Sequence, residues 1–236
     1  LAVASPATVS RCGMVYMEPT SLGYDVLLQS WLNKTPKLLG EKFRGMFQML
    51  FDKFVPSVLG FVRRYCNEPL PTVNNCLVDG LLHLMDTFIA DYYEKEDGSE
   101  NRSTAEIEQF LTQLPSVFVF CLVWSLGCTG DAVSRKMLNS FLRAEITSFG
   151  LDLGLPQEGL LYDYKFDLVS DAWIKWSVSI PPYEYDPKLT FAELIIPIDD
   201  SICYTFLLDT LVRNRKHVLM TGPTGTGKTV NIQGLL

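Results

Sequence analysis

Hydrophobic residues recur at intervals of three and four from residue 24 to residue 149, which predicts a succession of amphipathic helices. Proline, glycine and polar residues divide this pattern into expected helices at 24–32, 41–66, 75–94, 104–128 and 132–149. Ser103 or Thr104, together with Glu106, is expected to open the fourth helix, and Asp131 is expected to cap the fifth. Pro56 is expected to kink or split the second helix, because proline removes a backbone donor from the helix interior.

The stretch 151–196 has a different composition, since it is rich in proline, glycine, tyrosine and tryptophan. Alternating apolar and polar residues at 162–169 and 173–180 predict two short strands, which could form a hairpin. Trp173 and Trp176 in the second of these strands are interpreted as core aromatics rather than as a stacking site for a ligand. We therefore expect a connector that is structurally distinct from the helices before it.

The two ends of the chain carry a second pattern, in which short apolar runs predict buried strands at 13–17 and 216–221. A helix is expected at 199–213, and the basic cluster at 212–217 is interpreted as its solvated end. Residues 93–103 form the most polar stretch and are expected to be a mobile surface loop. The expected order is strand, helical bundle, connector, helix, strand and glycine-rich loop.

Composition narrows the class of protein. Among 236 residues, 47% are hydrophobic and 20% are charged, as in ordinary globular proteins. The net charge of −7 argues against general nucleic-acid binding, which needs an excess of lysine and arginine. The longest apolar run, 117–128, is shorter than the roughly 20 residues that cross a bilayer and is interpreted as a core helix. The six cysteines include no CxxC pair, so we expect reduced core residues in a cytosolic compartment rather than a zinc site or disulfide framework.

The sequence GPTGTGKT at 222–229 matches the phosphate-binding pattern GxxxxGK[ST]. Its residues are Gly222, Pro223, Thr224, Gly225, Thr226, Gly227, Lys228 and Thr229. Glycines let successive backbone N–H groups curl around a phosphate, and the following helix directs its positive end at the same anion. Lys228 is expected to reach the β- and γ-phosphates of a nucleotide, and the Thr229 hydroxyl is expected to bind Mg²⁺. The motif predicts binding of ATP or ADP with Mg²⁺.

Hydrolysis also needs acidic residues on a second strand, and no apolar run ending in such residues follows Thr229. The chain also begins with Leu1 and ends soon after the phosphate loop. We therefore expect a piece of a longer protein, divided at a module boundary. We expect this piece alone to bind phosphate weakly and to be inactive as an ATPase.

The segment VSRCGMVY near the N-terminus is similar to the Ser-Arg-Cys element of clamp-loader AAA+ ATPases. Taken with ASPATVSRCGMVYMEP, the segments VFVFCLVWSLG and VLMTGPTGTGKT resemble a dynein heavy chain, a microtubule motor. Their order resembles the end of the second AAA+ module, its lid, and the start of the third. The sequence of the connector, YDYKFD followed by two tryptophans, is more similar to axonemal than to cytoplasmic dyneins.

This resemblance implies an α/β AAA+ P-loop NTPase fragment: a mostly helical lid bundle with incomplete α/β nucleotide-binding pieces at both ends. It divides the chain into the end of the second large domain (1–20), the lid (21–150), the connector (151–196) and the start of the third large domain (197–236).

The resemblance also implies roles for two arginines. Arg11 would act in trans as an arginine finger on ATP bound to the first module, because its planar, permanently charged group suits a transferring phosphoryl group. The other interpretation of Arg11 is a surface arginine that opens a strand. Arg135 lies near the start of a lid helix, where AAA+ proteins keep a sensor arginine that contacts their own nucleotide. The other interpretation of Arg135 is a solvated helix arginine.

As a whole protein, the resemblance implies an ATPase in the cytoplasm and cytoskeleton, in the axoneme of a cilium or flagellum. Its partners would be neighbouring AAA+ modules of the same chain, with microtubules and dynein light and intermediate chains bound through other regions. Neither nucleic acid nor membrane is expected as a partner. The alternative is a non-motor regulatory or interaction protein, in which a helical scaffold precedes a single P-loop switch and Arg11 has no catalytic role.

Overall fold

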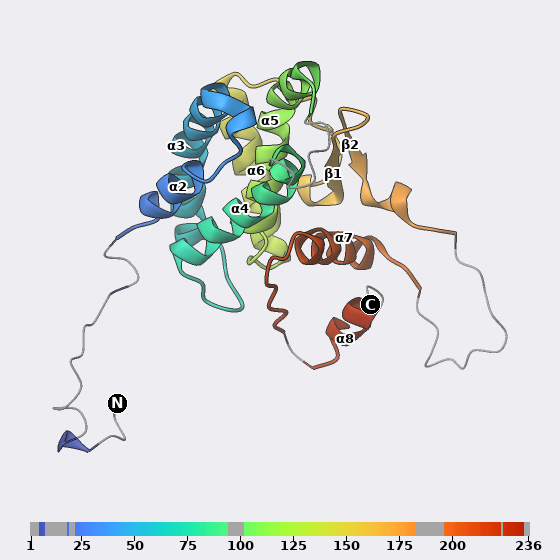
Figure 1. The fold of residues 1–236 in the computed structure, drawn as a ribbon. Helices are drawn as coiled ribbons and strands as arrows, with labels where there is room; N and C mark the ends of the chain where they lie inside the picture. The colour runs from blue at the N-terminus through green and yellow to red at the C-terminus, as the bar shows by residue number, and fades with distance from the viewer. Residues whose placement is uncertain are drawn as a thin grey trace.

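The computed structural model describes residues 5–7, 18, 22–93, 102–182, 196–222 and 224–233 (Figure 1). The expected strand at 13–17, the candidate finger Arg11 and most of the expected loop at 93–103 lie outside these residues. So does Pro223 of the phosphate loop.

A bundle of helices makes up most of the described chain. Its members are α2 (Asp25–Leu32), α3 (Gly40–Tyr65), α4 (Asn74–Ile89), α5 (Thr104–Ser125) and α6 (Ala132–Phe149), with the 3₁₀ turns Lys37–Leu39 and Ala90–Tyr92. Each helix buries the apolar stripe that its sequence predicts. Figure 1 shows the helices packed side by side, with the connector at one end and α7 beneath them.

The split expected at Pro56 is not observed, because α3 runs unbroken through that residue. Proline leaves the carbonyl group of Asp52 without its helical donor. Both Asp52 and Pro56 are exposed, so water can satisfy this carbonyl group. Water can therefore replace the hydrogen bond that Pro56 removes, and the helix continues through it.

Helix α5 is the centre of the core. Every residue from Ser116 to Ser125 is buried, and the helix packs against α3 and α4. By length and composition α5 could cross a membrane, but 72% of its most apolar window is buried inside the protein. The interpretation of 117–128 as a core helix is therefore confirmed. Phe118 meets Phe47 of α3 edge to face, with ring centroids 5.5 Å apart.

The helix caps agree with the sequence. Ser103 forms a capping box with Glu106 at the start of α5, and the Asp131 carboxylate accepts from the backbone N–H of Ser134 at the start of α6. Helix α6 ends at Gly150, which has a left-handed conformation with φ of 74°. These caps fix where α6 begins, which matters below because Arg135 lies in its first turn.

The connector contains the short antiparallel pair β1 (Tyr164–Asp167) and β2 (Ala172–Lys175), flanked by the 3₁₀ turns Leu161–Asp163 and Trp176–Ser179. Tyr164 pairs with Lys175, and Asp167 pairs with Ala172. Trp176 is buried, and its indole N–H donates to the Tyr162 carbonyl at 2.9 Å. Its structural role is therefore confirmed, and the connector is fastened to the bundle by its aromatic residues.

The C-terminal part contains α7 (Asp199–Arg213) and α8 (Lys228–Gln233), as Figure 1 shows. The expectation of a buried strand at 216–221 is wrong. In the described part of the chain these residues run as an extended segment outside any sheet (Figure 1), and Leu219 is 86% exposed. A strand needs a neighbour to satisfy its backbone groups. Within the described residues the only sheet is β1–β2, which offers this segment no partner.

Candidate functional site

The glycine-rich loop lies between the extended segment after α7 and the first residue of α8. Gly225 and Gly227 have φ of 84° and 75°, a left-handed conformation that residues with a Cβ atom rarely adopt. The motif glycines are therefore required by the backbone. The Lys228 ammonium group folds back over the loop, where it donates to the Gly222 carbonyl at 2.9 Å and to the Thr226 hydroxyl at 3.3 Å.

A cleft of about 920 Å³ separates this loop from the helical bundle. Apolar side chains of α7 and of the extended segment form one wall, and the bundle forms the other with Leu70, Trp124 and Arg135. Gly222, Thr226 and Lys228 lie in the same lining. The structure thus brings Arg135 and the phosphate loop, which are far apart in sequence, to one cleft.

Arg135 is held by contacts within the bundle. Its Nη2 atom donates to the Cys128 carbonyl at 3.0 Å, and its guanidinium group lies over the Tyr162 ring, 5.3 Å from the centroid. Its Nε atom is buried and has no hydrogen-bond partner within the part of the chain that the structure describes. The interpretation of Arg135 as a solvated helix arginine is therefore wrong. The guanidinium group retains a donor that a ligand or water could satisfy.

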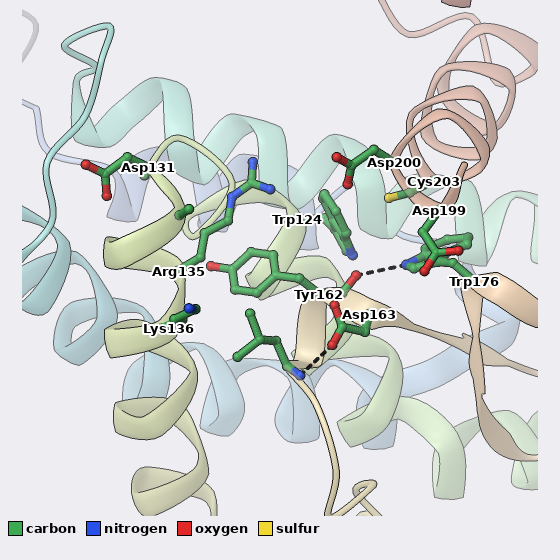
Figure 2. Close-up of a pocket in the computed structure, with 13 residues that line it drawn as sticks. Trp124, Asp131, Arg135, Lys136, Tyr162, Asp163, Trp176, Asp199, Asp200 and Cys203 are labelled. Atoms are coloured by element: carbon green, nitrogen blue, oxygen red, sulfur yellow. Dashed lines mark hydrogen bonds between the residues drawn. The ribbon is translucent and has the colours of Figure 1, made fainter. Parts of the chain in front are cut away.

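A second cavity of about 410 Å³ adjoins the first and shares Arg135 and Trp124 with it (Figure 2). Figure 2 shows Arg135 and the Tyr162 ring on one side and Asp199 and Asp200, from the first turn of α7, on the other. Burial raises the pKa of the Tyr162 hydroxyl and of the Cys203 thiol. These groups stay neutral near pH 7, which argues against a nucleophilic thiolate in this cavity.

The start of α6, and with it Arg135, depends on Asp131. The Asp131 carboxylate accepts from the Asn67 side-chain amide at 3.0 Å and from the Ser134 backbone N–H at 2.9 Å. These hydrogen bonds, that of Asn67 first, lower the pKa of Asp131 from 3.8 to about 2. A carboxyl group with a lowered pKa in the folded state stabilises the protein above its unfolded pKa, and the effect is lost as the pH falls through the folded value.

We expect Asp131→Asn to keep α6 capped at pH 7, because asparagine caps helices as well as aspartate does. The variant should lose the part of the acid destabilisation that falls between about pH 4 and pH 2, since it has no carboxyl group to protonate. Asp131→Ala should lower the melting temperature at pH 7 as well. Thermal unfolding of the three proteins from pH 7 to pH 2 tests this prediction. Identical pH dependence in wild type and Asp131→Asn would contradict it.

The sequence predicts a phosphate loop and singles out Arg135, but it gives no sign of the contact that fastens the loop segment to the bundle. Lys216 forms an ion pair with Asp86, 130 positions earlier, although the basic cluster 212–217 was expected to be solvated. That expectation holds for Arg213, whose side chain is 78% exposed, but it is wrong for Lys216. No local signal in the sequence marks so distant a pair.

Comparison with known proteins places these observations in a family. The sequence model described as "Dynein heavy chain AAA lid domain" matches residues 47–178, and the model described as "P-loop containing dynein motor region" matches residues 183–236. The chain is 36% identical over 252 residues to human dynein axonemal heavy chain 1 and 35% identical over 237 residues to mouse dynein axonemal heavy chain 2. All of this chain is covered in both comparisons, but only 6% and 5% of the relatives.

Proposed function

The chain belongs to the dynein heavy chain family, and from that premise we propose that it joins two nucleotide-binding modules of an ATP-driven microtubule motor ring. In this proposal residues 1–20 end the second large domain, and residues 21–150 form its lid. Residues 151–196 connect the lid to the third large domain, which begins at residue 197. The match of a lid model to residues 47–178 and of a P-loop model to residues 183–236 supports the order of a lid followed by a P-loop domain.

One observation carries the proposal: a phosphate loop with left-handed glycines and an inward-folded Lys228 opens onto a cleft walled by the helical bundle. These residues fit ATP or ADP with Mg²⁺. The loop backbone and Lys228 would hold the phosphates, and the Thr229 hydroxyl would hold the metal ion. A nucleotide held there would supply a phosphoryl group, whose transfer to water would also need acidic residues of a second strand.

The two arginines complete the proposal. Arg11 would reach the γ-phosphate of ATP in the first module, so that the chain supplies parts of different sites. Arg135 would contact the nucleotide of its own module from the lid. Its fixed position at the start of α6 and its buried Nε atom, which has no hydrogen-bond partner among the described residues, support this role.

The activity belongs to the whole heavy chain in this proposal, because an acidic strand for hydrolysis is expected after the phosphate loop. The chain spans about 6% of the length of the curated relatives it matches, so microtubule binding would lie elsewhere in the protein. The names of those relatives support an axonemal, cytoskeletal location. Light and intermediate chains would bind other regions.

The test is microtubule gliding by the purified complete heavy chain. Gliding that requires ATP and stops on its removal supports the motor function. The alternative, a non-motor P-loop switch, predicts nucleotide binding without gliding and without stimulation of hydrolysis by microtubules. That second result would overturn the proposed function.

A further inference from the structure

Asp86 joins three parts of the chain. It lies in the last turns of α4, where its Oδ1 atom accepts from the Trp31 indole N–H of α2 at 2.5 Å. Its Oδ2 atom forms an ion pair with Lys216, which follows α7. One carboxylate therefore links the lid bundle to the segment that leads into the phosphate loop.

The pair is sheltered from solvent. The Asp86 and Lys216 side chains are 16% and 23% exposed, whereas Arg213 and Asp209 at the end of α7 form an open surface pair. Exposed pairs contribute little because water and salt screen them, but a shielded charge loses much when its partner is removed. Breaking the Asp86–Lys216 pair is therefore expected to have a larger effect at this junction than breaking the Asp209–Arg213 pair.

Trp31 holds the Asp86 carboxylate in place independently of Lys216. Trp31 packs against Phe47, with ring centroids 4.6 Å apart, and against Phe43 at 6.2 Å. This cluster fixes the indole N–H, and the N–H fixes one oxygen of Asp86. The other oxygen is presented toward Lys216 without the loss of much side-chain freedom.

Lys216 is also positioned by the backbone. Arg215 adopts a left-handed conformation with φ of 57°, and the Lys216 N–H donates to the Leu211 carbonyl at 2.9 Å. This cap ends α7 and turns the chain toward α4. Beyond Lys216 the extended segment runs to Gly222, whose carbonyl group accepts from Lys228. Five residues of backbone, 217–221, therefore separate the ion pair with the lid from the phosphate loop.

We propose that Asp86 and Lys216 are positioning residues for the phosphate loop, which hold it at a set distance from the lid of the preceding module. The proposal rests on the proposed function, because it assumes that residues 222–229 bind nucleotide. Lys216 fixes the start of the segment that lines the cleft with Val218, Met220 and Gly222. When the pair is broken, the segment that forms this wall of the cleft is no longer held in place. Nucleotide must then order the segment on binding, which lowers the affinity.

This arrangement makes lid position and nucleotide affinity mutually dependent. A coupling between two sites changes affinity by roughly 5- to 150-fold, and the effect is reciprocal. Nucleotide at this loop is therefore expected to strengthen the contact between Lys216 and the lid, and loss of that contact is expected to weaken nucleotide binding.

The experiment is hydrogen exchange on the complete heavy chain, titrated with ATP. Protection of the peptide 221–233 reports binding at this loop alone. Lys216→Met and Asp86→Asn should each raise the midpoint of protection about fivefold or more. Asparagine keeps an acceptor for the Trp31 N–H, so Asp86→Asn removes the charge selectively. The midpoint of protection in the double variant should be no higher than in either single variant, since both changes remove the same interaction.

Three controls separate a positioning role from a general loss of stability. Lys216→Arg keeps the charge and should stay within about twofold of wild type, the scatter expected for independent changes. Arg213→Met removes the neighbouring surface pair and should leave the midpoint unchanged. Protection of α5, which is remote from the pair, should be the same in all variants. Loss of this protection would show that a variant unfolds the bundle. In that case the midpoints of Lys216→Arg and Asp86→Asn test the positioning role.

The outcomes distinguish the two proposals. No ATP-dependent protection of residues 221–233 in the wild type would overturn the proposed function. Protection in the wild type with an unchanged midpoint in both Lys216→Met and Asp86→Asn would overturn the positioning role alone. Additive losses in the double variant would also overturn it, because the two residues would then act separately.

Discussion

Replacing Lys228 by alanine in the intact heavy chain is expected to abolish nucleotide binding at the loop 222–229. The Lys228 ammonium group is held over the loop by the Gly222 carbonyl, where it would meet the β- and γ-phosphates. Hydrogen bonds to charged groups contribute about 1.5–3 kcal/mol each, so the loss of two weakens binding by about a hundredfold or more. The measurement is the ATP concentration that protects residues 221–233 from hydrogen exchange.

Lys34→Ala is the matched control, since Lys34 is an exposed lysine in the turn after α2. It should leave protection unchanged. An affinity of Lys228→Ala equal to that of wild type would show that this loop is not a nucleotide site. Loss of binding in both variants would point to unfolding rather than to phosphate contact.

Replacing Arg11 by alanine is expected to slow ATP turnover at the first module by about a thousandfold or more, as the loss of an arginine finger does. In the proposed role the guanidinium group would stabilise the charge that develops on the phosphoryl oxygens, and alanine would leave that charge without a donor. Single-turnover hydrolysis by the complete heavy chain measures the effect. Arg11→Ala should leave ATP-dependent protection of residues 221–233 intact, because Arg11 is proposed to serve the other site.

Arg64→Ala provides the comparison, since Arg64 is an exposed arginine near the end of α3. It should turn over ATP at the wild-type rate. A loss of less than twofold in Arg11→Ala would contradict the finger assignment and would leave Arg11 as a surface residue at the start of a strand.

Local patterns in the sequence predicted the features that local physics determines. The spacing of Phe43, Phe47 and Phe54 predicted the buried face of α3, and the capping residues Ser103 and Asp131 predicted where α5 and α6 begin. The phosphate-loop motif is equally local, because its glycines and lysine act within eight consecutive positions. Each of these features needs only neighbours along the chain.

Predictions of features that depend on the surrounding structure were absent or wrong. The apolar run at 216–221 has the composition of a buried strand, but strand formation requires a neighbouring strand. Lys216 was interpreted as solvated because its partner Asp86 lies in another helix, far away in sequence. Pro56 failed to split α3 because the exposed carbonyl group of Asp52 can be satisfied by water, which depends on burial rather than on residue type.

The central claim is that this chain contributes to two different nucleotide sites. The most direct test is the structure of the intact heavy chain with a non-hydrolysable ATP analogue. We expect the Arg11 guanidinium group to contact the γ-phosphate of a nucleotide held by the first module, while Lys228 contacts the phosphates of a separate nucleotide. Arg11 and Lys228 on the same nucleotide, or Arg11 away from any phosphate, would contradict it.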